Sequence, residues 1–297
     1  MQEELASGAR IGSFTIERLV GKGSMGAVYR AWSPSANTRV ALKMLSLHYK
    51  GNKLVQDLFE EEAKAGLQID HPNIVQTLYV GHHENRPYIV FEFVNGIPLA
   101  DMIKKGPLPE SQCIWVLRQM GQALRHLQKK NILHQDIKPE NILIDASGTC
   151  KLTDLGFARL PATQIEWSDL QAGTSLYMSP EQWLAGQGLP PIDSRTDLYS
   201  LGATIYHAAT GEPPFKSHDE EELCRQHLDV RPEAANLRIS GLSMEFAKIL
   251  AKLLEKPPQD RYANAEELLL AMRALSVPQK PPVVSVSRVT AHRSAQQ

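Results

Sequence analysis

The chain of 297 residues is 42% hydrophobic and 22% charged, with a formal net charge of −1 and a sequence pI near 6.8. This composition is typical of a soluble globular protein, and the length allows one large domain or two lobes with a sizeable core. Because the net charge is close to zero, no global field favours nucleic acid or an anionic membrane as a partner, and an anionic ligand must be held by local groups.

The cysteines and the start of the chain favour a reducing, aqueous environment. Cys113, Cys150 and Cys224 are far apart and follow no CxxC spacing, which argues against a disulfide framework or a zinc site. No apolar run approaches the ~18 residues that a membrane helix needs, and the acidic start MQEELASG is not typical of a signal peptide. We therefore expect a cytoplasmic protein with no membrane segment in this chain.

Strands dominate the pattern over residues 14–94, after an N-terminal extension at 1–13. The expected strands are FTIERLV, AVYRAW, RVALKML, IVQTLYVG and PYIVFEFV, separated by turn residues. One helix interrupts them, from Lys53 to about Ile69. Its predicted apolar stripe at helical spacing consists of Leu54, Leu58, Glu62, Gly66 and Ile69. We predict a small β-rich lobe that ends near Asn95–Gly96.

Glycines cluster between the first two strands, in the sequence GKGSMGAVY. Gly21, Gly23, Gly26 and Val28 form a GxGxxGxV pattern, which by itself could serve only a tight turn. A dinucleotide-binding turn would open a helix and be followed by an acid about 20 residues on, whereas here another strand follows and no acid lies near Ser46. No Gly-Lys-Ser/Thr closes the motif, which argues against a P-loop. The remaining ligand-binding interpretation is a hairpin that closes over a polyphosphate with its backbone N–H groups.

The next strand carries a lysine that is a candidate ligand. In Val40-Ala41-Leu42-Lys43, the alternation places Ala41 and Lys43 on one face, so that a small side chain lies beside a cation. The predicted helical stripe would bury Glu62 as a charge that needs a cation, and Lys43 is the nearest candidate. A surface lysine and a solvated helix glutamate are the common alternatives, and both stay open at this point.

Polar groups concentrate in HQDIKPEN at 134–141, between two apolar runs at 131–133 and 142–144 that we interpret as short buried strands. A rigid loop between buried strands is a common place for catalytic groups, and a solvated turn is the simpler alternative. Asp154-Leu155-Gly156 follows the apolar strand CKLT. Asp154 and Asn141 would together offer the oxygen ligands that Mg²⁺ prefers, although Asp-x-Gly is also common in plain turns.

Helices dominate from Leu99 onward. SQCIWVLRQMGQALRHLQ has apolar groups at helical spacing, DLYSLGATIYHAATG is apolar nearly all round with Gly211 as a stop, and AEELLLAMRAL follows Asn264 as a cap. We predict a larger helical lobe over 95–276. The segment 277–297 is rich in Pro, Ser and basic residues without periodicity, and we predict a disordered tail or linker.

In their order and spacing, GKGSMGAVY, VALK, Glu62, HQDIKPEN and DLG resemble the signature motifs of protein kinases, most closely the eukaryotic-like (Hanks-type) serine/threonine kinases of bacteria. The resemblance covers roughly residues 14 to 275. GTSLYMSPE at 173–181 resembles the family's substrate-docking strip, and DLYSLG at 197–202 resembles its buried central helix. The resemblance implies an α+β, bilobal protein kinase-like fold, with a small β-rich N-lobe containing one main helix and a larger α-helical C-lobe.

The resemblance further implies transfer of the γ-phosphate of ATP to Ser/Thr hydroxyls of protein substrates. Asp136 would be the catalytic base and Lys138 would steady the γ-phosphate. Lys43, paired with Glu62, would hold the α- and β-phosphates. Asn141 and Asp154 would bind Mg²⁺, with Mn²⁺ as an alternative. The residues around the nucleotide would be Gly21, Lys22, Gly23, Ser24, Gly26, Val28, Ala41, Lys43, Phe91, Glu92, Val94 and Leu143.

Within that set, the adenine ring would lie between Ala41 or Val28 and Leu143, with the backbone of Glu92 and Val94 supplying hydrogen bonds. Core packing is the alternative role for these apolar residues.

Two further contacts follow from the same resemblance. Glu181 would pair with Arg261, and Asp197 would brace the catalytic loop from below. The alternatives are an ordinary surface acid and a helix cap, because Ser194-Arg-Thr-Asp197 also fits a capping box.

Two positions depart from the family pattern. Gln135 replaces the usual Arg of His-Arg-Asp, and a neutral side chain cannot pair with a phosphorylated residue. We therefore hypothesise that activity does not depend on phosphorylation of Thr163, Ser168 or Thr174 through this route. Dephosphorylated and autophosphorylated protein should then differ in rate by less than about 100-fold, or ~2.7 kcal/mol of barrier. Leu155 replaces the usual Phe and still fills an apolar slot, so we expect a minor effect.

A pseudokinase that binds nucleotide or partners as a scaffold is the alternative function, and it is disfavoured because Lys43, Asp136, Asn141 and Asp154 are all present. The basic tail ending at Gln297 resembles the juxtamembrane linkers of bacterial kinases, and it could equally be a free terminus. The chain is thus expected in the cytoplasm, either alone or as the cytosolic part of a kinase with a membrane tether beyond Gln297. The reading frame beyond Gln297 would decide between these two arrangements.

Overall fold

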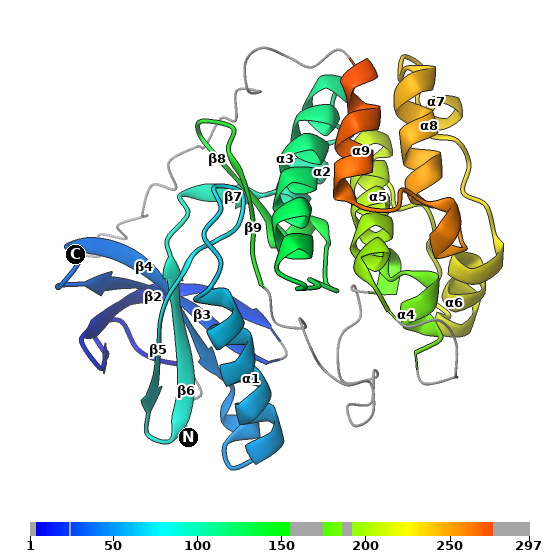
Figure 1. Cartoon of the computed structure of the whole chain (residues 1–297). Coiled ribbons are helices and arrows are strands. Elements are labelled where there is room, and N and C mark those ends of the chain that lie inside the picture. Colours follow the sequence, from blue (N-terminus) through cyan, green and yellow to red (C-terminus); the bar gives the residue numbers. More distant parts are fainter. Residues whose placement is uncertain (1–3, 24, 155–174, 186–191, 276–297) are drawn as a thin grey trace, which may run out of the picture.

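The structure, a computed structural model, describes residues 4–23, 25–154, 175–185 and 192–275, apart from the side chains of Leu58 and Glu62. These residues form two lobes (Figure 1). The N-lobe contains a six-stranded antiparallel sheet in the order β1-β2-β3-β4-β6-β5. Its strands are β1 (Arg10–Ile11), β2 (Phe14–Gly23), β3 (Gly26–Ser33), β4 (Thr38–Leu45), β5 (Thr77–His83) and β6 (Arg86–Glu92).

Alternation along β4 defines the two faces of this sheet. Val40, Leu42 and Met44 are buried in one apolar cluster with residues of β2 and β3. Successive side chains of a strand point to opposite faces, so Ala41 and Lys43 lie together on the other face, as predicted.

Helix α1 (Lys53–Gly66) packs on the sheet with a stripe that agrees only in part with the one predicted. Its buried residues among those described are Val55, Phe59, Ala63 and Gly66, whereas Leu54 is exposed. Of the predicted stripe, Gly66 and Ile69 are buried and Leu54 is not, while the side chains of Leu58 and Glu62 are outside the described part, so the predicted burial of Glu62 stays untested.

The C-lobe begins with a second antiparallel sheet of three strands, β7 (Gly96–Pro98), β8 (Ile142–Asp145) and β9 (Cys150–Leu152). This sheet lies between the N-lobe and the C-lobe helices (Figure 1). The helices described in this lobe are α2 (Leu99–Ile103), α3 (Glu110–Lys129), α4 (Pro180–Trp183), α5 (Ser194–Thr210), α6 (Glu220–Asp229), α7 (Ala235–Arg238), α8 (Met244–Leu253) and α9 (Ala265–Ala271).

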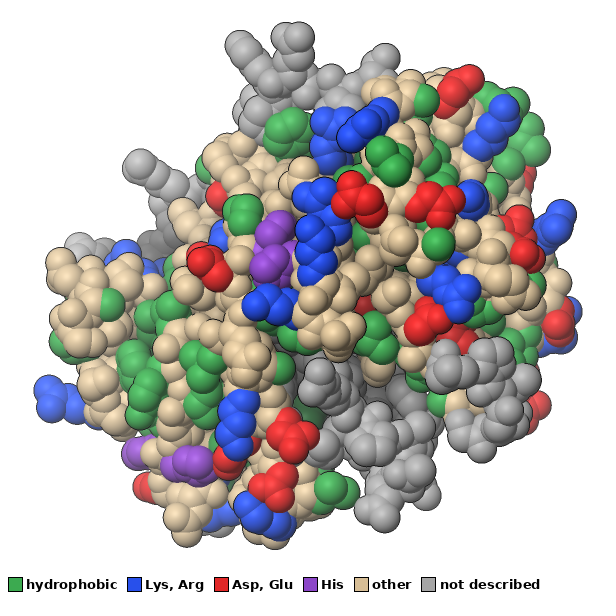
Figure 2. Space-filling model, viewed as in Figure 1, with side chains coloured by type: hydrophobic (Ala, Val, Ile, Leu, Met, Phe, Trp, Pro, Cys, Tyr) green, Lys and Arg blue, Asp and Glu red, His purple; other side chains and the backbone are tan. Residues whose placement is uncertain are grey.

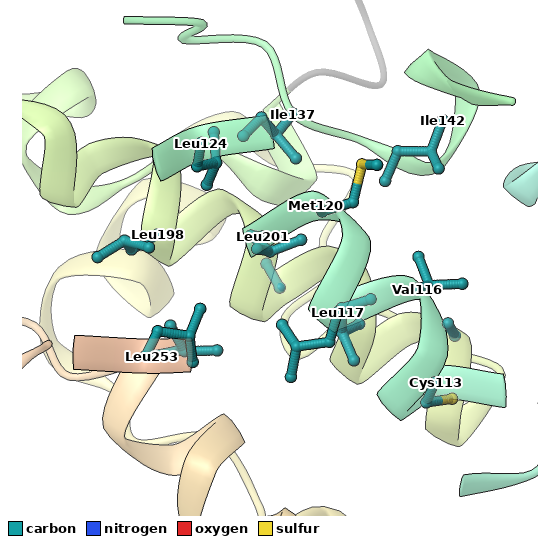
Figure 3. Packing of buried hydrophobic residues seen from close by; sticks show 14 of the residues in the cluster. Cys113, Val116, Leu117, Met120, Leu124, Ile137, Ile142, Leu198, Leu201 and Leu253 are labelled. Atoms are coloured by element: carbon teal, nitrogen blue, oxygen red, sulfur yellow. The ribbon is translucent and has the colours of Figure 1, made fainter. Parts of the chain in front are cut away.

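The largest apolar core of the described residues lies among α3, α5, α8 and β8. Figure 3 shows side chains of these helices gathered in one cluster, joined by Ile137 and Ile142. Helix α5 is buried along nearly its whole length, in agreement with its apolar sequence. Gly211 ends α5 at a φ of 79°, a conformation that favours glycine, and Asn264 caps α9, so both predicted helix ends are confirmed.

Two strand predictions need correction. Residues 131–133 form no strand, because α3 ends at Lys129 and the chain turns through Asn131 at a φ of 55°. The run IVQTLYVG becomes a strand only at Thr77, since Ile74 instead makes an isolated bridge to Leu152 of β9. Both errors concern short apolar runs, whose secondary structure cannot be assigned from hydrophobic periodicity alone.

The visible surface carries both signs of charge. Figure 2 shows Lys and Arg side chains interspersed with Asp and Glu over this face of the C-lobe, which agrees with the net charge of −1. Among the residues that the structure describes, no helix is both long enough and apolar enough to span a bilayer.

Candidate active site

The loop from His134 to Asn141 is held in place by buried groups. Asp197, which is 2% exposed, accepts hydrogen bonds from the backbone N–H groups of His134 at 2.8 Å and Gln135 at 2.7 Å. The His134 ring accepts from the Asp136 N–H at Nδ1 (3.3 Å), so its Nε2 donates to the Thr153 carbonyl (2.9 Å). The prediction that Asp197 braces this loop is confirmed.

The capping-box alternative for Asp197 is wrong. Helix α5 is capped by Asp193, whose carboxylate accepts from the Arg195 N–H at 2.8 Å. Asp197 is therefore free to turn its carboxylate toward the loop instead of the helix end.

The two carboxylate oxygens of Asp136 have different surroundings. Oδ2 accepts a hydrogen bond from Asn141 Nδ2 at 2.9 Å and pairs with Lys138 Nζ at 3.0 Å. Oδ1 is buried and has no hydrogen-bond partner among the described residues. A buried polar oxygen without a partner is costly and is a common feature of catalytic sites. The loop thus holds one oxygen of Asp136 and leaves the other for a ligand.

Asp154 follows β9 and lies against Lys43 of β4. The Lys43 Nζ is 2.8 Å from Asp154 Oδ1, and the two residues are 111 positions apart in the sequence. Attraction to Lys43 is the main cause that lowers the pKa of Asp154, against the effect of its burial. Asp154 adopts a φ of 56°, unusual for a residue other than glycine, which turns its carboxylate toward β4.

Asn141 supplies the other predicted metal ligand. It is buried, and its side-chain nitrogen donates to the backbone carbonyl and to the carboxylate of Asp136. The amide oxygen is therefore the atom that would face a cation. Amide and carboxylate oxygens are suitable ligands for Mg²⁺ or Mn²⁺. The described residues contain no group of three or more His, Cys, Asp or Glu side chains that could hold a metal ion, so phosphate and water would have to complete the coordination of a metal here.

The glycines of the β2–β3 hairpin differ in their surroundings. A Cβ at Gly26 would lie 2.0 Å from the Met44 carbonyl oxygen, so the fold itself requires glycine there. A Cβ at Gly21 would meet nothing within 4 Å, and one at Gly23 only the Gly26 carbonyl oxygen at 4.0 Å. Neither Gly21 nor Gly23 has a positive φ. The fold gives no reason for these two glycines, which fits a hairpin that must let a ligand approach its backbone.

The apolar residues expected around the adenine are all half-buried. Val28, Ala41 and Leu143 are partly exposed, although their neighbours along each strand, such as Leu42 and Ile144, are fully buried. Because successive residues of a strand point to opposite faces, these three residues lie on the faces turned away from such buried neighbours, where a ligand could contact them. Phe91 is also half-buried and packs against the cluster that includes α1.

The end of β6 is tied to the C-lobe. Glu92 pairs with Lys151 of β9 at 2.6 Å and accepts the Gln76 N–H at 2.9 Å, while its own N–H donates to the Gln76 carbonyl. Val94 is half-buried in the same segment. With the Glu92 N–H used in this way, its carbonyl is the group that could bind adenine.

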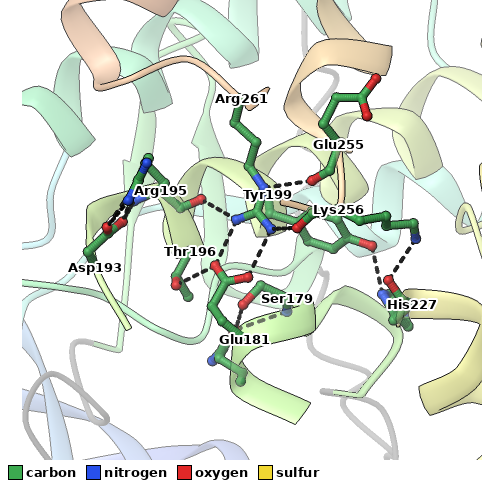
Figure 4. Close-up of polar contacts among 11 residues, drawn as sticks. Ser179, Glu181, Asp193, Arg195, Thr196, Tyr199, His227, Glu255, Lys256 and Arg261 are labelled. Atoms are coloured by element: carbon green, nitrogen blue, oxygen red, sulfur yellow. Dashed lines mark hydrogen bonds and ion pairs between the residues drawn. The ribbon is translucent and has the colours of Figure 1, made fainter. Parts of the chain in front are cut away.

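A buried ion pair holds α4 in place next to the catalytic loop at 134–141. Arg261 donates to both carboxylate oxygens of Glu181, at 2.7 and 2.8 Å (Figure 4), so this predicted pair is confirmed. Burial acts to raise the pKa of Glu181, but the Arg261 guanidinium and the Thr196 hydroxyl outweigh it and lower that pKa.

Some predicted residues lie away from the cleft or outside the described part. Lys22 pairs with Glu4, and both side chains are about half exposed, so its predicted contact with the nucleotide stays a prediction. Ser24, Leu155, Thr163, Ser168 and Thr174 are outside the described residues, as is the Glu62 side chain, and their predicted roles stay untested.

Three side chains that bond to residues of the site were not predicted from the sequence. They are Lys151, Thr196 and Gln182, which bond to Glu92, Glu181 and Gln135, respectively. Lys151 alternates with buried Cys150 and Leu152, and this alternation could have placed it on the side facing β6. No local signal indicates that Thr196 bonds to Glu181 or that Gln182 bonds to the catalytic loop.

Comparison with known proteins agrees with this geometry. The family model for the protein kinase domain matches residues 14–272. The chain belongs to the protein kinase family. A crystal structure of the Mycobacterium tuberculosis PknI kinase domain superposes with a TM-score of 0.71 at 24% identity, covering 91% of this chain and 98% of that chain. The two-lobed kinase fold expected from the sequence is thereby confirmed.

Curated relatives of this kinase domain are bacterial serine/threonine kinases. A probable serine/threonine-protein kinase of Clostridium perfringens is 34% identical over 94% of this chain and 40% of its own length. The serine/threonine-protein kinase PrkC of Bacillus subtilis is 33% identical over 88% of this chain and 40% of its own length. The resemblance to Hanks-type bacterial kinases is therefore confirmed, and membership implies the use of ATP, a divalent cation and protein substrates. The kinase domain spans less than half the length of these relatives.

Proposed function

We propose that this kinase domain transfers the γ-phosphate of ATP to serine or threonine hydroxyls of protein substrates, with Asp136 as the catalytic base. The observation that carries this proposal is the asymmetry of the Asp136 carboxylate. Its Oδ2 is held by Asn141 and Lys138, while its buried Oδ1 has no partner among the described residues. A substrate hydroxyl at Oδ1 would fill that place and lose its proton to it as the oxygen attacks phosphorus.

The other polar side chains would position the phosphates. Lys138 is nearly buried beside Asp136, where its ammonium group would offset the charge on the transferred phosphoryl group. Lys43 would hold the α- and β-phosphates from β4, and the glycine hairpin would cover them with backbone N–H groups. Asn141 and Asp154 would hold a Mg²⁺ ion, with Mn²⁺ as an alternative. When bound, the cation would neutralise phosphate charge.

Substitution of Asp136 by Asn tests the base directly. Transfer from γ-labelled ATP to a generic protein should fall by at least about 100-fold, because Asn cannot accept the proton. Calorimetry should show nearly unchanged nucleotide affinity. The matched control is Asp145→Asn, the same chemical change on β8, where the side chain only caps the turn to Thr149.

The outcomes separate the two functions considered. Equal incorporation by Asp136→Asn and the unsubstituted protein would remove Asp136 from its role. Nucleotide binding without any transfer by the unsubstituted protein would instead favour a pseudokinase scaffold.

The cellular setting is part of the proposal. We infer a cytoplasmic domain acting on protein substrates with no nucleic-acid partner, supported by the balanced charge and the three unbridged cysteines. A membrane tether beyond Gln297 is the alternative to a free domain, and the downstream reading frame tests it.

A further inference from the structure

Gln182 of α4 contacts the backbone of the catalytic loop. Its side chain is 4% exposed, and its Nε2 donates to the Gln135 carbonyl oxygen at 2.9 Å across 47 positions of sequence. Gln135 immediately precedes Asp136. Helix α4 therefore reaches the loop one residue away from the proposed base.

The orientation of the Gln182 amide is fixed by its other end. Its Oε1 accepts hydrogen bonds from the Ser179 N–H at 3.0 Å and from the Ser179 hydroxyl at 3.1 Å. Both Ser179 groups act as donors here, so the oxygen must face Ser179 and the NH₂ group must face Gln135. The neighbouring Glu181 is itself held by Arg261, which gives Gln182 a rigid support.

The backbone that Gln182 contacts is in an unfavourable conformation. Gln135 has a φ of 62°, in the left-handed region that residues other than glycine seldom adopt. Such a residue stays there only when its surroundings hold it. The Gln135 N–H donates to Asp197, and its carbonyl accepts from Gln182, so the residue is fastened at both ends.

We propose that Gln182 is a positioning residue for phosphoryl transfer. Together with Asp197 it holds Gln135 in the left-handed conformation and thereby orients the Asp136 carboxylate. This inference rests on the proposed function, since Asp136 is assigned there as the base. Gln182 contacts the loop and not the proposed nucleotide contacts, so it should affect the chemical step and leave ATP binding intact.

The test compares Gln182→Glu with Ser179→Ala in the full chain. Gln182→Glu keeps the acceptor for Ser179 but sets a carboxylate oxygen against the Gln135 carbonyl. We expect kcat to fall by roughly 10- to 100-fold, with the KM for ATP changed less than about twofold. Exchange of the His134 and Gln135 amide hydrogens should become about tenfold faster, because these hydrogens are held only while the loop keeps its shape. Ser179→Ala removes the hydroxyl but keeps the Ser179 N–H bond to Gln182 Oε1, which still turns the NH₂ group toward Gln135, so all three quantities should stay within about threefold.

Gln182→Met is a second variant of similar volume that cannot donate a hydrogen bond to the Gln135 carbonyl. It provides the test if Gln182→Glu does not fold. Unchanged kcat and unchanged amide exchange in both Gln182 variants would overturn the proposal, as would an equal loss in Ser179→Ala. If the unsubstituted chain transfers no phosphate, the proposed function fails, while the amide exchange comparison still decides whether Gln182 holds the loop.

Discussion

Gly21 and Gly26 lie in the same hairpin, but the fold requires glycine only at Gly26. The β3 backbone at Gly26 approaches β4 so closely that a methyl group would overlap the Met44 carbonyl oxygen. A Cβ at Gly21, in the hairpin expected to cover a nucleotide, would meet nothing within 4 Å. One glycine thus serves the fold, and we infer that the other serves the ligand.

Alanine substitution should separate these two roles. Gly26→Ala should lower the free energy of unfolding by about 2 kcal/mol, because backbone atoms must move to admit the methyl group. Gly21→Ala should change it by less than about 0.5 kcal/mol but weaken ATP binding about tenfold, or ~1.4 kcal/mol. Urea titrations and calorimetry of both variants measure the two effects. Loss of stability in Gly21→Ala, or full ATP affinity in it, would contradict the assignment.

At the scale of elements, helix α6 is held against α5 by a buried histidine. His227 is 0% exposed, and its Nδ1 lies 2.9 Å from the Tyr199 hydroxyl. Burial, and then the nearby Lys256 ammonium, lower the pKa of His227 to about 3. The Lys256 Nζ donates to the carbonyls of Gln226 and His227 at the end of α6, while burial, and then the charge of Arg261, lower the pKa of Lys256 to about 7. His227 is therefore neutral in the folded protein at neutral pH.

Because His227 is buried in its neutral form, the free energy of unfolding depends on pH. The unfolded chain binds a proton at His227 below about pH 6.5, whereas the folded protein does so only near pH 3, so stability falls as the pH drops through this window. Between pH 7 and pH 4 the unsubstituted protein should lose about 3 kcal/mol more than His227→Gln, which does not titrate. Urea unfolding at several pH values measures the difference. Parallel pH profiles for the two proteins would show that His227 is not buried as a neutral group.

Helices and strands with a clear hydrophobic periodicity could be predicted from the sequence. Where the periodicity fits more than one face, the buried face could not be predicted. Helix α5 is apolar nearly all round, and Gly211 is a clear stop, so its position and burial were correct. In α1, Leu54 and Val55 are both apolar, and the sequence alone does not decide which one faces the sheet. The choice is made by packing against β4 and β6, which a single segment does not contain.

At the scale of the whole molecule, the decisive contacts join residues far apart in sequence. Two ion pairs join the N-lobe to the C-lobe: Lys43 with Asp154, and Glu92 with Lys151. Motif resemblance predicted that Lys43 and Asp154 serve the same site, but it gave no sign that they bond to each other. Gln182 also escaped prediction, because its role depends on how α4 lies beneath the catalytic loop.

We infer that these contacts converge on one nucleotide and one cation. The most direct test is a crystal structure with a non-hydrolysable ATP analogue and Mg²⁺. We expect the triphosphate beneath the Gly21–Gly26 hairpin and beside Lys43, a cation bound by oxygens of Asn141 and Asp154, and Asp136 Oδ1 facing the γ-phosphate. A nucleotide bound elsewhere, or a cleft in which Asp136 Oδ1 points away from the phosphates, would contradict this inference.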